Sequence, residues 1–238
     1  MEPTDLNRRA WDEVHRRRAD VMAGQLGIPE PIQERLPALA GKHVLHLQCA
    51  TGEATVALKE QGAMVTGVDI SGEALAIARE RAPDAVFVQA DVHSLPLELL
   101  RGRFDLVFTG GGVLVWLHDL DAWASGIATA LQPGGELFLY DMHPVALCLD
   151  EVSLRWRDDY FDERPIMEVG WSHFPLPGEP AQEQKVERFW RLGQVVTAVG
   201  GAGLVVRSLD ELPSPYDWKR LDKRVPSEFV LRAEKPSV

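Results

Sequence analysis

The feature that most constrains the fold is an alternation of short apolar runs with helical patterns between residues 44 and 141. Apolar runs typical of strands occur at 44–48, 64–69, 85–89, 104–109 and 136–141. Helical patterns lie between them at about 53–61, 73–81 and 119–131. This alternation predicts a mostly parallel sheet with helices on both faces. The strands are nearly all apolar, as expected when both faces of a sheet are covered.

The segments on either side of this core extend the prediction. Residues 5–23 are expected to form a helix, because Leu6, Ala10 and Val14 recur at four-residue spacing and Gly24 can end it. A helix at 191–200 and strands at 204–209 and 228–233 are expected near the C-terminus. Residues 153–182 interrupt the rhythm with aromatic, charged and proline residues, which favours an insertion or lid outside the sheet.

Composition excludes several classes of protein. No apolar run approaches the roughly 20 residues that span a bilayer, and the charged N-terminus lacks a signal core. The two cysteines, Cys49 and Cys148, are too few for a disulfide framework or a zinc cluster. A net charge of −11 argues against nucleic-acid binding, because such binding is mainly electrostatic. We expect a cytoplasmic protein with a small-molecule substrate and without a metal site. The sequence gives no indication of the oligomeric state.

Candidate ligand-binding residues stand where successive strands end, which is where open α/β sheets bind ligands. They are the Gln48–Gly52 turn, Asp69, Asp91 and the Thr109–Gly112 segment. The turn precedes a helix, so its free N–H groups can hold a polar ligand end. Asp69 can accept two hydrogen bonds from a ribose diol. Asp91 can accept from an exocyclic amine, and the neighbouring Val92 N–H can donate to a ring nitrogen.

Each of these positions also has a structural alternative. An aspartate at a strand end often serves as a turn or capping residue, and Asp69 could serve the turn at Ser71–Gly72 in this way. The glycines at 110–112 permit close backbone approach, or they only make a loop flexible. The functional interpretation is favoured because the four candidates occur at successive strand ends in the correct order.

Together the motifs resemble the class I S-adenosylmethionine-dependent methyltransferases. HLQCATGE stands where that family has its glycine-rich loop, and GVDIS resembles its acidic second motif. ADVHSLPL, FDLVFTGGGVLVWL and LQPGGELFLYD resemble the later motifs through the fifth strand. VPSEFVLRAEKP resembles the antiparallel seventh strand. The resemblance is to bacterial small-molecule enzymes whose first motif reads HLQC.

The resemblance implies an α/β fold with a doubly wound, seven-stranded, mostly parallel Rossmann-like sheet, an antiparallel last strand and an insertion after the fifth strand. It implies a single methyltransferase domain over 1–238, with residues 1–40 as a helical cover. The expected activity is methyl transfer from S-adenosylmethionine to a small-molecule acceptor. The cofactor-binding residues are expected to be His46, Gln48, Cys49, Ala50, Gly52, Asp69, Ile70, Asp91, Val92, Thr109, Gly110 and Gly111.

The first motif departs from the family pattern at three positions. His46 replaces the usual acid, Gln48 the first glycine and Ala50 the second, whereas Gly52 and Glu53 match. A protonated His46 could not accept from the cofactor ammonium, and the two larger side chains would crowd the loop. A non-catalytic S-adenosylmethionine-binding module is therefore one alternative. An NAD(P)-dependent oxidoreductase is another, although its G-x-G-x-x-G motif is absent.

Candidates for acceptor contact follow the fourth and fifth strands. His143 in YDMHP is the candidate base, with capping of the next segment as its alternative. His118 is expected to be structural, because it precedes a helix cap at Asp119. The expected acceptor contacts are Trp11, Trp116, Tyr140 and Trp171.

Overall fold

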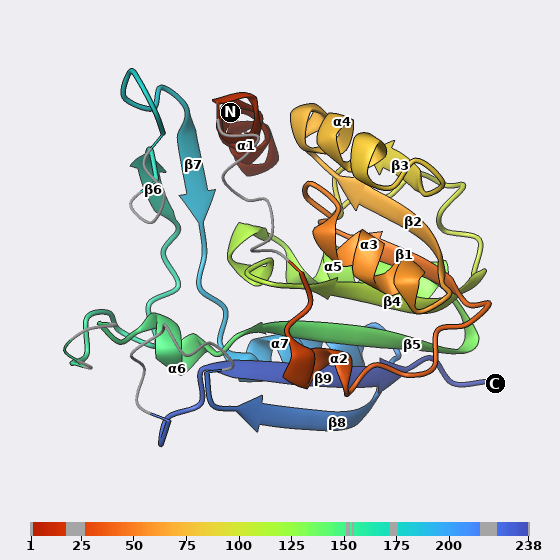
Figure 1. Cartoon of the computed structure of the whole chain (residues 1–238). Helices are drawn as coiled ribbons and strands as arrows, with labels where there is room; N and C mark the ends of the chain where they lie inside the picture. The colour runs from red at the N-terminus through yellow and green to blue at the C-terminus, as the bar shows by residue number, and fades with distance from the viewer. Residues whose placement is uncertain are drawn as a thin grey trace.

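The computed structural model describes residues 2–17, 27–150, 153, 155–171, 176–214 and 223–237. Within these residues the architecture is a seven-stranded sheet with helices on both faces, accompanied by a small two-stranded sheet (Figure 1). The strand order in the large sheet is β3-β2-β1-β4-β5-β9-β8. Its strands are β1 (His43–Leu47), β2 (Met64–Asp69), β3 (Val86–Gln89), β4 (Phe104–Gly110), β5 (Leu131–Met142), β8 (Val205–Leu212) and β9 (Glu228–Glu234).

Strand directions confirm the expected doubly wound sheet with an antiparallel last strand. β1 pairs in parallel with β2 and β4, and the parallel ladder continues to β3 on one side and β5 on the other. β9 runs antiparallel to both β5 and β8. The fifth strand begins at Leu131, five residues before the expected start, because Leu131 still pairs with Phe104 across a register shift.

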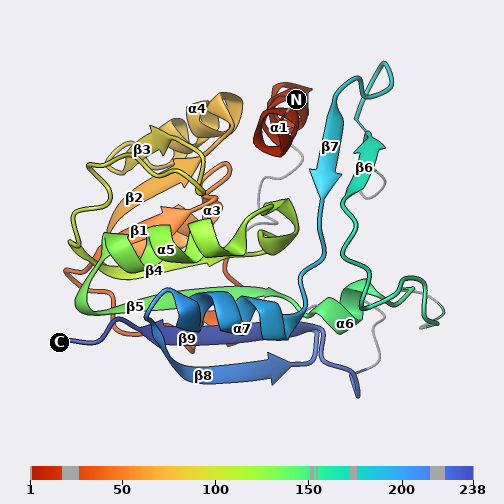
Figure 2. The same cartoon turned by 180° about the vertical axis from the view of Figure 1, so that it is seen from behind.

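Helices cover the two faces of this sheet with separate cores. α5 (Leu120–Ala130) and α7 (Leu192–Gly201) supply Trp123, Ile127 and Val199 to one core (Figure 2). α2 (Glu30–Gln33) and α3 (Glu53–Glu60) supply Ile32 and Leu58 to the other. α4 (Gly72–Arg81) packs beside α3. Among the described residues, no helix has the length and apolar character of a membrane-spanning segment.

The segment after β5 leaves the large sheet. It forms the short helix α6 (Pro144–Leu147), and then β6 (Ile166–Val169) pairs antiparallel with β7 (Gln184–Glu187) as a separate sheet. This hairpin extends beyond residue 182, where the sequence pattern places the end of the insertion. It stands next to α1 (Pro3–Arg17) in both views (Figures 1 and 2). The expected continuation of α1 to residue 23 and its stop at Gly24 lie outside the described residues.

α1 is fastened to the hairpin through polar side chains. The Asn7 amide donates to the Val186 carbonyl at 2.9 Å and accepts from its N–H at 2.7 Å, so it pairs with β7 as a neighbouring strand would. The Glu13 carboxylate accepts from the N–H groups of Gln182 and Glu183 at 3.0–3.1 Å. These bonds make α1 and the β6–β7 hairpin one structural unit.

Candidate functional site

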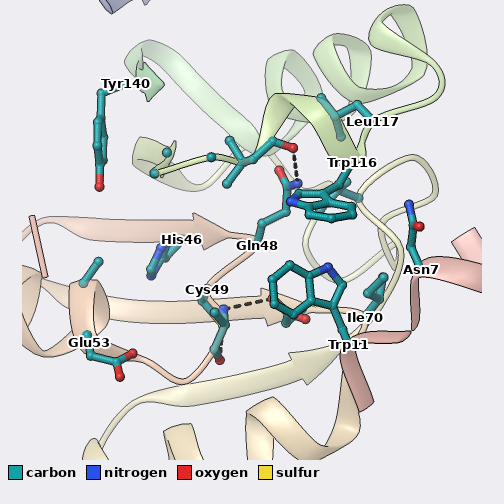
Figure 3. Close-up of a pocket in the computed structure, with 18 of the residues that line it drawn as sticks. Asn7, Trp11, His46, Gln48, Cys49, Glu53, Ile70, Trp116, Leu117 and Tyr140 are labelled. Atoms are coloured by element: carbon teal, nitrogen blue, oxygen red, sulfur yellow. Dashed lines mark hydrogen bonds between the residues drawn. The ribbon is translucent and has the colours of Figure 1, made fainter. Parts of the chain in front are cut away.

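A cavity lies along the carboxyl ends of the parallel strands, under α1 (Figure 3). It brings together residues that follow β3, β2, β1, β4 and β5, which are neighbours in the sheet. The expected site residues that line it are His46, Gln48, Cys49, Ala50, Asp69, Ile70, Asp91, Val92, Gly110, Gly111, Trp11, Trp116 and Tyr140. Residues Gly52, Thr109, His143 and Trp171 are not part of the lining.

The turn after β1 adopts a glycine-type backbone although two of its residues carry side chains. φ is +53° at Gln48, +46° at Ala50 and +86° at Gly52, so every second residue is left-handed. L-residues pay about 1–2 kcal/mol for this conformation, and such strain concentrates at functional sites. The turn therefore has the shape that a glycine-rich loop would adopt, at the positions where the glycines are replaced.

The Gln48 side chain is held across the sheet edge. Its Nε2 donates to the Val113 carbonyl at 3.0 Å, and its Oε1 accepts from Thr109 Oγ1 at 3.4 Å (Figure 3). Thr109 is fully buried, so its place is behind the cavity wall. Gly52 also lies behind the wall, where an added Cβ would come within 3.1 Å of the Ala78 Cβ. Both residues thus shape the site without facing it.

Asp69 links the turn to the second strand. One carboxylate oxygen accepts from the Ala50 N–H at 2.9 Å, and the other accepts from the Ser71 N–H at 2.9 Å. Burial raises the pKa of this carboxyl, while these two hydrogen bonds act in the opposite direction. The turn-capping alternative is therefore present in the structure. Because each oxygen has a second lone pair, Asp69 can still accept from a ligand in the cavity.

His46 is neutral in this environment. The ring is buried, and its Nδ1 lies 2.8 Å from Thr55 Oγ1. Burial lowers the pKa of His46 to about 3, so the imidazole carries no charge near pH 7. A protonated His46, which would repel a cofactor ammonium, is thereby excluded.

Asp91 is engaged by residues that the sequence analysis missed. Thr4 Oγ1 in α1 donates to one carboxylate oxygen at 2.9 Å, and the His93 N–H and Nδ1 approach the other at 2.9 and 2.6 Å. Burial opposes ionisation, but these contacts together lower the pKa of Asp91 to about 2. The carboxylate is therefore ionised, and it joins α1 to the third strand.

The glycines after β4 are required by the close approach of Tyr140. A Cβ at Gly110 would lie 2.3 Å from the Tyr140 ring and carbonyl, and one at Gly111 would lie 2.8 Å from its hydroxyl oxygen. The adjoining backbone is held by the buried Asp141, which accepts from three successive N–H groups at 112–114 at 2.7–2.9 Å. Loop flexibility, the alternative for these glycines, does not describe this turn.

Three tryptophans form an aromatic wall. Trp11 lies 5.1 Å from Trp116 and 4.5 Å from Trp171 between ring centroids, and Figure 3 shows Trp11 and Trp116 close together in the cavity. Trp11 and Trp116 face the cavity, whereas Trp171 packs behind them. Trp171 thus supports the other two rings. It does not line the cavity, in contrast to the expectation that it contacts the acceptor.

His143 does not have the position of a catalytic base. Its Nδ1 accepts from the Val145 N–H at 3.2 Å, which caps α6, and its Nε2 lies 2.9 Å from Glu211 Oε1. The side chain is buried away from the cavity lining. Both ring nitrogens are engaged in holding secondary structure, so the expected role as a base is replaced by the capping role. His118, as expected, precedes the Asp119 cap of α5.

Sequence reasoning missed part of the lining. Thr4 and Asn7 enter only because α1 closes over the strand ends, and His93 enters from the loop after β3, two residues beyond Asp91. Glu228 enters because it begins β9, and the first residue of an antiparallel strand stands at the same edge as the last residues of its parallel neighbours. That signal is in the sequence once the last strand is known to be antiparallel. Among the described residues, no group of three His, Cys, Asp or Glu could hold a metal ion.

Comparison with known proteins agrees with this architecture. Residues 44–135 match the model of a methyltransferase domain family. An uncharacterised methyltransferase of Synechocystis is 40% identical over 46% of this chain and 51% of its own length. A trans-aconitate 2-methyltransferase of Paracidovorax citrulli is 34% identical over 56% of this chain and 53% of its own length. The chain therefore spans about half the length of these curated relatives.

Solved structures extend the likeness to most of the chain. An S-adenosylmethionine-dependent methyltransferase from Mesorhizobium loti is 22% identical, with a TM-score of 0.66 over 86% of this chain and 95% of that one. A putative enzyme of the same class from Listeria monocytogenes is 21% identical, with a TM-score of 0.68 over 86% and 96%. At such identities the likeness shows the fold. Residues 44–135 thus resemble a methyltransferase domain, and the chain shares the Rossmann-like fold of these solved structures.

Proposed function

We propose that the protein binds S-adenosylmethionine in this cavity and transfers its methyl group to a small-molecule acceptor. The observation that carries the proposal is the left-handed backbone at 48, 50 and 52, beside two cavity-facing aspartates at the ends of β2 and β3. Backbone strain of this kind concentrates at ligand-binding and active sites. The relatives named trans-aconitate 2-methyltransferase and ubiquinone biosynthesis O-methyltransferase support a small-molecule acceptor.

The charge of the cavity fits this cofactor. S-adenosylmethionine has a sulfonium, an ammonium and a carboxylate, so its net charge is positive. Glu53, Asp69 and Asp91 line the part of the cavity that would hold the cofactor, and Asp91 is ionised. A wall of carboxylates stabilises a bound cation. The residues present therefore suit this ligand better than a dinucleotide, whose pyrophosphate is negative.

Each strand end has a task in the proposal. The ribose hydroxyls would be held by Asp69 and the adenine end by Asp91 and the Val92 N–H. The turn at 48–52 and the glycines at 110–111 would flank the methionine end, next to the neutral His46. When bound, the cofactor supplies an electrophilic methyl group whose bond to sulfur breaks as the acceptor atom attacks.

The protein's own contribution is mainly to orient the acceptor and to exclude water. α1 and the β6–β7 hairpin would serve as the cover, because Thr4, Asn7 and Trp11 of α1 line the cavity. Trp116 and Tyr140 would position the acceptor against the methyl group. No histidine is assigned as a base, since His143 caps α6.

Isothermal titration tests the proposal directly. The wild-type protein is expected to bind S-adenosylmethionine and S-adenosylhomocysteine, and to give no heat with NAD. Binding of NAD with no response to either sulfur ligand would overturn the proposal in favour of an oxidoreductase. Binding of both ligands without methyl transfer to any fraction of a bacterial metabolite extract would instead favour a non-catalytic binding module.

A further inference from the structure

The charges around the cavity restrict what the acceptor can be. Four carboxyl side chains line the cavity, namely Glu53, Asp69, Asp91 and Glu228. Within the part of the chain that the structure describes, no lysine or arginine is among the lining residues. A ligand carboxylate or phosphate taken from water into such a site would leave its charge unpaired, which is costly.

The histidines in the lining are either neutral or already bonded to a carboxylate. Burial lowers the pKa of His46 to about 3, and burial, the largest of several effects, lowers that of His15 to about 4. Both rings are therefore neutral at pH 7. His93 is bonded to the ionised Asp91 carboxylate at 2.6 Å, so it is already engaged.

Two described cations near the cavity, Arg81 and Lys185, are also engaged. Arg81 forms an ion pair with Glu53 and donates to the Thr51 carbonyl at 3.0 Å. Lys185 is buried, and its Nζ lies 2.9 Å from Glu187 and 3.3 Å from Glu168. That Nζ lies 6.0 Å from the centre of the Trp116 ring, behind the aromatic wall. Neither cation is free to receive an anionic acceptor.

The end of the cavity away from Asp91 combines apolar surface with one buried carboxyl group. Met142 in β5 pairs with Glu228 in β9, and Tyr140 lies two residues earlier in β5, so all three belong to one face of the sheet. Glu228 is only 4% exposed. Tyr140 and Met142 supply the aromatic and apolar surface at this end, while Trp11 and Trp116 line the same cavity on the other side of Gln48 (Figure 3). In sheet order, β5 and β9 lie beyond the strands that would hold the cofactor.

We propose that the acceptor carries no carboxylate or phosphate and has an apolar body with an amine or hydroxyl group, whose N–H or O–H donates to Glu228. This inference rests on the proposed function and refines it. Aromatic rings and a carboxylate together favour neutral or cationic groups. It separates this chain from the trans-aconitate 2-methyltransferases among its relatives, because trans-aconitate has three carboxyl groups.

Three probes with one apolar body test the inference. 3-Phenylpropylamine, 3-phenylpropanol and 3-phenylpropionate are titrated into the protein saturated with S-adenosylhomocysteine. The amine or the alcohol is expected to bind at least about tenfold more tightly than the carboxylate, a difference of 1.4 kcal/mol. Trans-aconitate is expected neither to bind nor to accept a methyl group from labelled S-adenosylmethionine.

Two variants assign the preference to one residue. Glu228→Gln is expected to reduce the preference for the amine over the carboxylate by about tenfold, while S-adenosylhomocysteine affinity stays within twofold. Glu60→Gln removes the same charge from an exposed position on α3 and is expected to change neither quantity. The second variant therefore controls for the change in net charge.

These outcomes distinguish a failure of the acceptor inference from a failure of the proposed function. Equal or tighter binding of the carboxylate, binding of none of the three probes, or an unchanged preference in Glu228→Gln each overturns the inference. In all three cases S-adenosylhomocysteine still binds, so the proposed function stands. Failure of the wild-type protein to bind S-adenosylhomocysteine would instead refute the proposed function itself.

Discussion

Replacing Asp69 should weaken both the empty protein and its hold on the cofactor. Asp69→Ala removes the acceptors of the Ala50 and Ser71 N–H groups, each 2.9 Å away. A hydrogen bond to a charged group contributes about 1.5–3 kcal/mol. Water in the cavity can replace part of this, because the carboxylate is half-buried. We therefore expect the free energy of unfolding to fall by about 2–4 kcal/mol.

The same substitution should reduce cofactor affinity. Loss of one charged acceptor for the ribose diol corresponds to about 10- to 150-fold at roughly 1.4 kcal/mol per decade. Asp69→Asn keeps the shape and one acceptor, so it should fall between the wild type and Asp69→Ala on both measures. Urea denaturation of the ligand-free protein and titration with S-adenosylhomocysteine below the melting temperature measure the two effects separately.

Asp105 provides a matched control at the opposite end of the sheet. Its carboxylate accepts from the His43 N–H at 2.8 Å and from Gln132 Nε2 at 2.9 Å. Asp105→Asn should therefore lower stability by about 1–2 kcal/mol and leave S-adenosylhomocysteine affinity unchanged. Unchanged cofactor affinity in Asp69→Ala, or unchanged stability of its ligand-free form, would refute the reasoning.

Three further predictions concern residues in and beside the cavity. Burial lowers the pKa values of His46 and His15 to about 3 and 4, against about 6.5 in the unfolded chain, so unfolding takes up protons below pH 6.5. The free energy of unfolding, measured by urea titration, should therefore fall by about 1–2 kcal/mol per histidine from pH 7 to 5. A stability that does not change with pH would contradict this. Gly110→Ala places a Cβ 2.3 Å from Tyr140 and should cost about 2 kcal/mol or more in thermal unfolding, whereas a wild-type melting temperature would disprove the close approach. His143→Ala should lower stability by about 1 kcal/mol through loss of the α6 cap without altering S-adenosylhomocysteine affinity; an affinity loss would return His143 to the site.

The large sheet was predictable because its strands are read from local apolar runs. All seven expected strands occur in the structure, six of them within a few residues of their expected bounds. The exception is β5, which begins early at Leu131. The pairing of Leu131 with Phe104 depends on a register shift that a run of apolar residues cannot reveal. Parallel strands bring their carboxyl ends to one edge, so the aspartates at two of those ends could be placed in one site from sequence alone.

The parts of the site that were missed depend on long-range contacts. Thr4 reaches Asp91 across 87 residues of sequence, and Asn7 reaches Val186 across 179, so no local pattern indicates either. The role of His143 depends partly on Glu211, which lies 68 residues away in the sequence and contacts its Nε2. The left-handed backbone at Ala50 was likewise hidden, because an alanine gives no sign of positive φ.

The most direct measurement of the central claim is a crystal structure of the complex with S-adenosylhomocysteine. The ribose hydroxyls are expected within hydrogen-bonding distance of the Asp69 carboxylate, and the adenine is expected beside Asp91 and Val92. The sulfur atom is expected on the side of the cavity that faces Gly110, Trp116 and Tyr140. A ligand bound outside this cavity, or bound within it with the ribose away from Asp69, would contradict the account.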